Sequence, residues 1–156
     1  MTATDEVAAF LFGEARLLDQ RRWQDWLGLF AEGGMYWAPL RFDQPDPVNH
    51  ASLFYEDALL REVRAQRLEE KRAWSQQPVT QAARIVGNVL PLPAEDGDIV
   101  VASTFHMLEW RRDGHRMLGG QYTHRLRRTP SGLRIVLKRI DLINREDVQD
   151  TLETFL

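Results

Sequence analysis

Cysteine is absent from all 156 residues of the sequence, and no stretch of the chain is apolar over any great length. Without cysteine there is no disulfide framework, which is the usual device of small secreted proteins. The apolar runs fall well short of the roughly 20 residues that a membrane-spanning helix needs. An excess of basic residues is also missing, because the formal net charge is −3, and this argues against a nucleic-acid-binding surface. The first residues lack the basic segment that opens a signal peptide, so we expect a cytoplasmic protein.

What the sequence does contain is ordinary for one globular domain. Hydrophobic residues make up 44% of the chain and charged residues 28%, and a single core commonly forms from about 100–150 residues. We therefore expect one domain over residues 1–156. The periodicity changes once: residues 1–72 are mainly helical with one strand segment, residues 81–143 form antiparallel strands, and residues 144–156 form a tail.

Three helices are predicted in the first half of the chain. The first begins near Thr4-Asp5, whose side chains can cap a helix, and the third covers about residues 56–72. The second carries an apolar stripe with the i, i+3, i+4, i+7 spacing of one helix face, formed by Trp23, Trp26, Leu27 and Phe30. The pair Gly33-Gly34 predicts the end of this second helix and the beginning of an extended segment.

The second half of the chain has the alternation and the turn residues of β-strands. Four strands are predicted, over residues 81–90, 98–110, 115–128 and 133–143, with hairpin turns at Asp113-Gly114 and at residues 130–132. Helices followed by an antiparallel meander indicate an α+β fold, in which the N-terminal helices pack on the concave face of a curved, mainly antiparallel sheet. The strand over residues 98–110 is apolar on both faces, so we expect the outer face of the sheet to be buried against another subunit.

Several segments together carry a family resemblance, and residues 14–40, EARLLDQRRWQDWLGLFAEGGMYWAPL, are the most informative of them. The others are a proline-rich loop at residues 43–47, the start of the third helix at 51–57, its arginine-rich body at 59–68, the strand Arg84–Val89 and the strand over 119–127. In this order and wording they resemble the small (beta) subunit of bacterial aromatic-ring-hydroxylating dioxygenases. The resemblance extends over nearly the whole chain.

This resemblance implies the cone-shaped fold shared with nuclear transport factor 2, and a function as the non-catalytic structural subunit of a dioxygenase. The partner alpha subunit would carry a Rieske [2Fe–2S] cluster and a mononuclear Fe(II), with electrons arriving from NAD(P)H through a reductase. This chain would hold no cofactor and no metal, since it lacks cysteine and its four histidines lack the close spacing of metal ligands. The resemblance also implies an α3β3 assembly with beta–beta contacts, and residues 52–68 look closest to subunits of benzoate-type enzymes.

The alternative reading is a stand-alone dehydratase or isomerase of the same cone fold. Its acid–base residues would be His106, Tyr122, His124 and Asp25, with Tyr36 and Asp141 as further candidates. Tyr122 and His124 share a strand face, and His106 could approach them across the hairpin at residues 113–114. Buried tyrosines and histidines more often satisfy hydrogen bonds in a core, however. A third reading is a binding or dimerisation module without an active site.

The last residues form a short amphipathic tail. Its apolar residues are Val148, Leu152, Phe155 and Leu156, and a segment of this length needs a surface on which to lie. Two arrangements stay open, one in which the tail folds back on its own sheet and one in which it reaches a neighbouring subunit. Arg139 and Asp141 are expected at a strand end or a subunit contact, although a charged pair there could also rim a pocket.

Overall fold

The computed structural model describes residues 2–74, 78–94, 96–112, 114–145, 152 and 154–156. In chain order the elements are α1 (Ala3–Asp19), α2 (Trp23–Leu27), β1 (Phe30–Pro39), β2 (Ser52–Glu56), α3 (Ala58–Trp74), β3 (Gln81–Leu92), β4 (Ile99–Arg111), β5 (Gly114–Thr129) and β6 (Gly132–Leu142). Among the described residues, no helix is long and apolar enough to cross a membrane.

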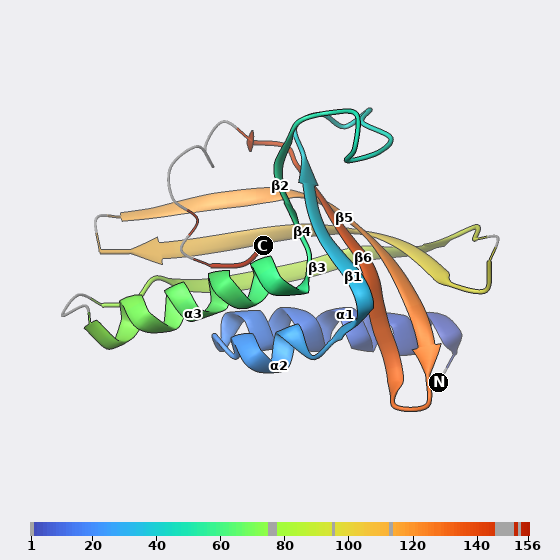
Figure 1. Cartoon of the computed structure of the whole chain (residues 1–156), viewed down its shortest axis with the longest axis horizontal. Coiled ribbons are helices and arrows are strands. Elements are labelled where there is room, and N and C mark those ends of the chain that lie inside the picture. Colours follow the sequence, from blue (N-terminus) through green and yellow to red (C-terminus); the bar gives the residue numbers. More distant parts are fainter. Residues whose placement is uncertain (1, 75–77, 95, 113, 146–151, 153) are drawn as a thin grey trace.

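The strands form one six-stranded sheet in the order β2-β1-β6-β5-β4-β3. Neighbouring strands are antiparallel except β1 and β6, which are parallel. The three helices lie together on one side of this strongly twisted sheet (Figure 1). We call the helix-covered side the inner face and the opposite side the outer face. The predicted α+β arrangement is confirmed.

Both long helices begin at side-chain caps, one of them earlier than predicted. The cap of α1 is Thr2, two residues before the predicted Thr4-Asp5, and it forms a reciprocal capping box with Asp5. The Asp57 carboxylate accepts a hydrogen bond from the Leu60 backbone N–H at 2.9 Å and so starts α3. That helix continues to Trp74, two residues past the predicted end.

The second helix is shorter than predicted, and Gly33 and Gly34 do not end it. The helix α2 stops at Leu27, and both glycines lie inside β1, at a register shift between Phe30 and Met35. Gly33 has φ +73°, and a Cβ on Gly34 would lie 2.6 Å from the Ile135 carbonyl oxygen. These glycines therefore permit a bulge in β1 where it pairs with β6. Glycine is also typical of a helix terminus, so the same residues in the sequence indicate either structure.

Residues 52–56, predicted as the start of the third helix, form the edge strand β2 instead. They pair antiparallel with β1, where Tyr36 lies opposite Glu56 and Trp37 opposite Tyr55. Burial alternates along this strand, with Phe54 and Glu56 buried and Tyr55 exposed, as a period of two requires. The first 72 residues thus hold two strand segments rather than one.

Apolar side chains of the helices and of the inner face form the core. On β4 and β5 the buried ones alternate along each strand, as the period of two requires. The members central to this layer are Val101, Phe105, Met107, Leu118, Tyr122 and Leu126, with Val7, Leu11 and Leu18 of α1 above them.

Two glycines give a matched test of this packing. A Cβ on Gly120, in β5, would lie 2.1 Å from the Asp141 carbonyl oxygen of β6, whereas a Cβ on Gly13, on the exposed side of α1, would meet nothing within 4 Å. We expect Gly120→Ala to lower the free energy of unfolding by about 2–3 kcal/mol, because backbone must move. Gly13→Ala should raise it by about 0.5–1 kcal/mol through helix propensity. Urea denaturation measures both, and equal effects would contradict the close approach of β5 and β6.

Candidate functional site

The predicted His106–Tyr122–His124 group does not form. Tyr122 lies opposite Ser103 in the β4–β5 register and, with His124, points to the inner face, where both are buried. His106 lies opposite Gly119 and is exposed on the outer face. Because successive strand residues alternate between faces, an odd separation from the buried Ser103 sends His106 to the other side of the sheet. This part of the catalytic hypothesis is wrong.

The two acidic candidates also lie away from the interior. Asp25 is on the exposed side of α2, where its carboxylate pairs with Arg22 at 2.8 Å. Asp141 lies on the outer face and accepts a hydrogen bond from Arg139 at 2.8 Å. Arg139 also donates to the carbonyl oxygens of Phe42 and Gln44. The pair therefore ties the loop after β1 to β6 rather than lining a catalytic pocket.

A buried polar cluster does occupy the inner face, and it is centred on Glu14 of α1. The Glu14 carboxylate accepts hydrogen bonds from Trp26 Nε1 at 2.9 Å and from His124 Nε2 at 2.8 Å. The Lys138 ammonium lies 3.0 Å from the same carboxylate. Glu14 is 3% exposed, and His124 and Lys138 are fully buried. An ionised carboxylate with three donors is a satisfied group in the core.

The charges of this cluster support each other. Burial alone would raise the pKa of Glu14, but the Lys138 and His124 side chains outweigh it and hold that pKa well below its usual range. Burial lowers the pKa of Lys138 from 10.5 to about 8, with the Glu14 carboxylate opposing the change. Burial also raises the pKa of Tyr122, whose ring is stacked on Phe105 at 4.1 Å. None of these groups is poised as an acid or base that a substrate could reach.

Sequence reasoning missed Glu14 and Lys138, and only Glu14 had a signal. Glu14 follows Val7 and Leu11 at seven and three residues, which places it on the buried stripe of the first helix. Lys138 is on the inner face because β6 has a bulge: Arg125 lies opposite Leu137, but Leu126 lies opposite Ile135. Strict alternation would place Leu137 on the same face as Leu133 and Ile135, and the bulge sends it to the opposite face.

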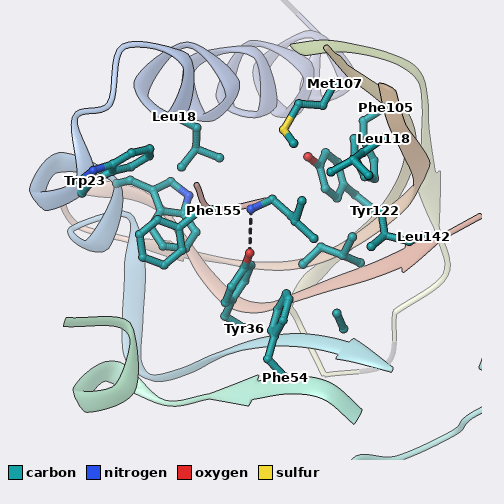
Figure 2. Packing of buried hydrophobic residues seen from close by; sticks show 14 of the residues in the cluster. Leu18, Trp23, Tyr36, Phe54, Phe105, Met107, Leu118, Tyr122, Leu142 and Phe155 are labelled. Carbon is teal, nitrogen blue, oxygen red and sulfur yellow. Dashed lines mark hydrogen bonds between the residues drawn. The ribbon is translucent and has the colours of Figure 1, made fainter. Parts of the chain in front are cut away.

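Chain segments from both ends of the sequence fill the interior around this cluster. Residues 154–156, which we call the tail segment, lie in the core with Phe155 1% and Leu156 0% exposed. The Phe155 ring lies among Trp23, Trp26 and Tyr36, and the Leu156 N–H donates to the Tyr36 hydroxyl at 2.8 Å (Figure 2). The folded-back arrangement of the tail is thus confirmed for these residues, while Val148 lies outside the described residues.

Three surface pockets formed by described residues lie along α3, between α1 and β3, and beside the β5–β6 hairpin. None of these three is lined by Glu14, His124 or Lys138. Within the part of the chain that the structure describes, no group of three or more His, Cys, Asp or Glu residues is placed to bind a metal. The donor set also does not fit a Rieske cluster, which needs two cysteines, because the sequence has none.

The outer face carries the other notable feature, a set of exposed apolar side chains on adjacent strands. We call it the outer apolar face, and its members are Ile85, Leu108, Trp110, Met117 and Ile143, each 40–75% exposed. Leu108 lies directly opposite Met117 across β4 and β5. Trp110 is opposite His115, and their rings are stacked at 5.8 Å. Monomeric proteins seldom expose a contiguous apolar patch of this kind, so the surface fits a contact with another subunit.

Known proteins resemble this chain over most of its length. A family model described as "Ring hydroxylating beta subunit" matches residues 13–147. The small subunit of 2-halobenzoate 1,2-dioxygenase from Burkholderia cepacia is 31% identical, covering 89% of this chain and 87% of that one. The small oxygenase component of the p-cumate 2,3-dioxygenase system from Pseudomonas putida is 36% identical, covering 86% and 76%. The crystal structure of the benzoate 1,2-dioxygenase beta subunit from Burkholderia mallei has a TM-score of 0.80 at 25% identity, covering 96% and 95%.

Proposed function

The chain belongs to the family of ring-hydroxylating beta subunits, and from this premise we propose that its task is to hold the catalytic alpha subunits of an aromatic-ring dioxygenase in register. Its fold is the cone-shaped α+β fold of nuclear transport factor 2. It is a subunit of an oxidoreductase and is not itself the catalytic chain. We propose how the chain contributes to the assembled enzyme, through which contacts, and for which class of substrate.

The observation that carries the proposal is the contrast between the two faces of the sheet. The inner face is filled, and its titratable residues Glu14, His124 and Lys138 are buried and paired with one another. The outer face presents apolar side chains to solvent. A chain with a closed interior and an open apolar surface gains by association rather than by binding a small substrate. This contrast favours a scaffold over a stand-alone dehydratase or isomerase.

We assign beta–beta contacts of an α3β3 assembly to the outer apolar face. For contacts with the alpha subunit we propose the loop after β1 and the sheet edge beside it. The three tryptophans of residues 14–40, Trp23, Trp26 and Trp37, are buried. The exposed apolar side chains next to that region are Leu40, Phe42 and Val48 of the loop and Tyr55 on the edge strand β2.

The cofactors of the reaction would belong to the partner. We expect the alpha subunit to hold the Rieske [2Fe–2S] cluster and the mononuclear Fe(II), which supply electron transfer and oxygen activation, with NAD(P)H as the electron source through a reductase. In this chain the absence of cysteine leaves no ligand set for the cluster. The contribution of the beta subunit is therefore positional, and we place the assembly in the cytoplasm.

An aromatic carboxylic acid is the substrate class we propose. Relatives of this chain are subunits of enzymes named for 2-halobenzoate, p-cumate, benzoate and toluate, and others are named for benzene and biphenyl. The product would be a cis-dihydrodiol of the ring. Because the pocket would lie in the alpha subunit, the substrate has to be tested on the assembled enzyme.

The test is recovery of the assembly from the native host through a tag on this chain. We expect a hetero-oligomer with equal amounts of two chains, containing iron and acid-labile sulfide and oxidising NAD(P)H when reductase and an aromatic acid are added. Native mass spectrometry gives the stoichiometry, and a sample lacking the tagged chain is the control. A metal-free homo-oligomer without a second chain would refute the proposal.

A further inference from the structure

Side chains, rather than strand pairing, hold the backbone of the tail segment inside the cone. The Leu156 N–H donates to the Tyr36 hydroxyl at 2.8 Å, and Lys138 Nζ donates to the Leu156 oxygen at 2.6 Å. The Arg84 guanidinium donates to the Phe155 carbonyl oxygen. These three anchors come from β1 and β6, which are neighbours in the sheet, and from β3 at its edge. Recognition of a short backbone by side chains from several strands is the arrangement of a receptor around a peptide.

Contacts outside the tail segment already fix the three anchoring side chains. Each has such a partner: Arg84 pairs with Asp19 at 2.6 Å, Lys138 with Glu14 at 3.0 Å, and the Tyr36 ring stacks on Phe54 at 4.4 Å. Because these contacts do not involve the tail segment, the anchors keep their positions whether or not it is bound. A binding site that is organised in advance loses less conformational entropy when its ligand enters.

The side chains of the tail segment also fit a site formed by residues of other helices and strands. The Phe155 ring centroid lies 4.3 Å from that of Trp26, 5.5 Å from that of Trp23 and 5.8 Å from that of Tyr36. Figure 2 shows this ring directed into the aromatic group formed by α2 and β1. Leu156 is fully buried in the same cluster. Edge-to-face and tilted aromatic contacts add specificity to the apolar burial.

We propose that the interior of the cone is a peptide-binding site, with the tail segment as its resident ligand. The site takes an extended apolar peptide in which an aromatic residue precedes a branched aliphatic one, here Thr154-Phe155-Leu156. The tail segment binds after the sheet and helices have formed, and a free peptide of the same sequence can replace it. This property belongs to the chain itself and does not depend on the alpha subunit or on the substrate of the assembly.

The whole chain tests the proposal when a specific protease site is inserted within residues 146–151. After cleavage, the fragment of residues 152–156 is no longer covalently attached, and a fluorescent synthetic peptide LETFL, amidated at its end, is added. We expect saturable exchange, seen as a rise in anisotropy and as the expected mass by native mass spectrometry. A peptide with Phe155→Ala and Leu156→Ala should bind at least about a hundredfold more weakly, since it loses the buried ring. If the native chain resists the protease, cleavage in urea and refolding precede the same measurement.

Two outcomes overturn the proposal. One is a cleaved chain that aggregates or fails to exchange its fragment, which would make the tail segment an integral part of the fold. The other is equal binding of the double-alanine peptide. The variant Tyr36→Phe supplies a matched control, because it keeps the ring and removes only the acceptor of the Leu156 N–H. Its affinity for LETFL should fall by about threefold to tenfold while its circular dichroism stays that of the parent.

Discussion

Replacing Glu14 by glutamine is expected to lower the free energy of unfolding by about 3–5 kcal/mol, because it leaves the Lys138 ammonium buried without a counter-charge. Glutamine keeps the size of the side chain, and its single amide oxygen can accept one of the hydrogen bonds that the two Glu14 oxygens accept from Trp26 and His124. What is lost is the negative charge 3.0 Å from Lys138, in a place where both groups are excluded from water. Urea denaturation at pH 7, followed by tryptophan fluorescence, measures the change.

The double variant Glu14→Gln with Lys138→Met is the control for this charge. Methionine fills the space of the lysine stem without an ammonium group, so the double variant should lie within about 1–2 kcal/mol of the parent. The double variant also lacks the hydrogen bond from Lys138 to the Leu156 oxygen and the contacts of the ammonium with the Tyr122 and Trp26 rings. If the single and double variants lose equal stability, the charge of Lys138 is not the cause and the explanation is wrong.

The same carboxylate predicts how stability depends on pH. A group whose pKa is lowered by folding stabilises the fold above its usual pKa of 4.5, and this contribution is lost as the pH falls below that value. The parent chain should therefore lose stability as it is acidified below about pH 4.5. The Glu14→Gln variant should show a flatter dependence in that range, because glutamine does not titrate. Unfolding curves between pH 3 and pH 7 compare the two.

Hydrophobic periodicity predicts the two faces of a strand only where the strand has no bulge. Alternation along residues 99–107 places Val101, Phe105 and Met107 on one face of β4, and all three are buried, although alternation alone does not say which face covers the helices. In β6 a strict alternation of side chains between the two faces does not hold beyond the bulge. One extra residue there exchanges the inner and outer faces for the residues that follow. A bulge has no signal of its own in one sequence. The same limit explains Gly33, whose positive φ is compatible with a helix end and with a strand bulge alike.

The candidate site shows a second limit, which concerns charged residues. Glu14 and Lys138 are 124 positions apart in sequence, and burial of either alone is unfavourable. Each becomes acceptable in the core only because the other is within an ion-pair distance, and that proximity is a property of the tertiary structure. Histidines and tyrosines are chosen as catalytic candidates because of their side-chain chemistry alone. Their partners, here Glu14 for His124, decide whether they are free to act on a substrate or form hydrogen bonds within the core.

Placing a charge on the outer apolar face is expected to abolish self-association of the chain. We choose Met117→Glu, because Met117 lies on a central strand, faces Leu108 and is 54% exposed, so the folded monomer should tolerate a carboxylate. An unpaired carboxylate buried at a subunit contact costs about 3–5 kcal/mol, which weakens association more than a hundredfold. Sedimentation velocity of the isolated chain should change from oligomer to monomer, while the urea midpoint moves little.

The matched control is Leu59→Glu, on the exposed side of α3, where the side chain is 70% exposed and belongs to the layer on the opposite side of the sheet. Glutamate suits a helix, so this variant should sediment as the parent does. Loss of the oligomer in Met117→Glu alone would assign self-association to the outer apolar face. Retention of the oligomer would place the beta–beta contact elsewhere, and loss in both variants would point to a general effect of negative charge.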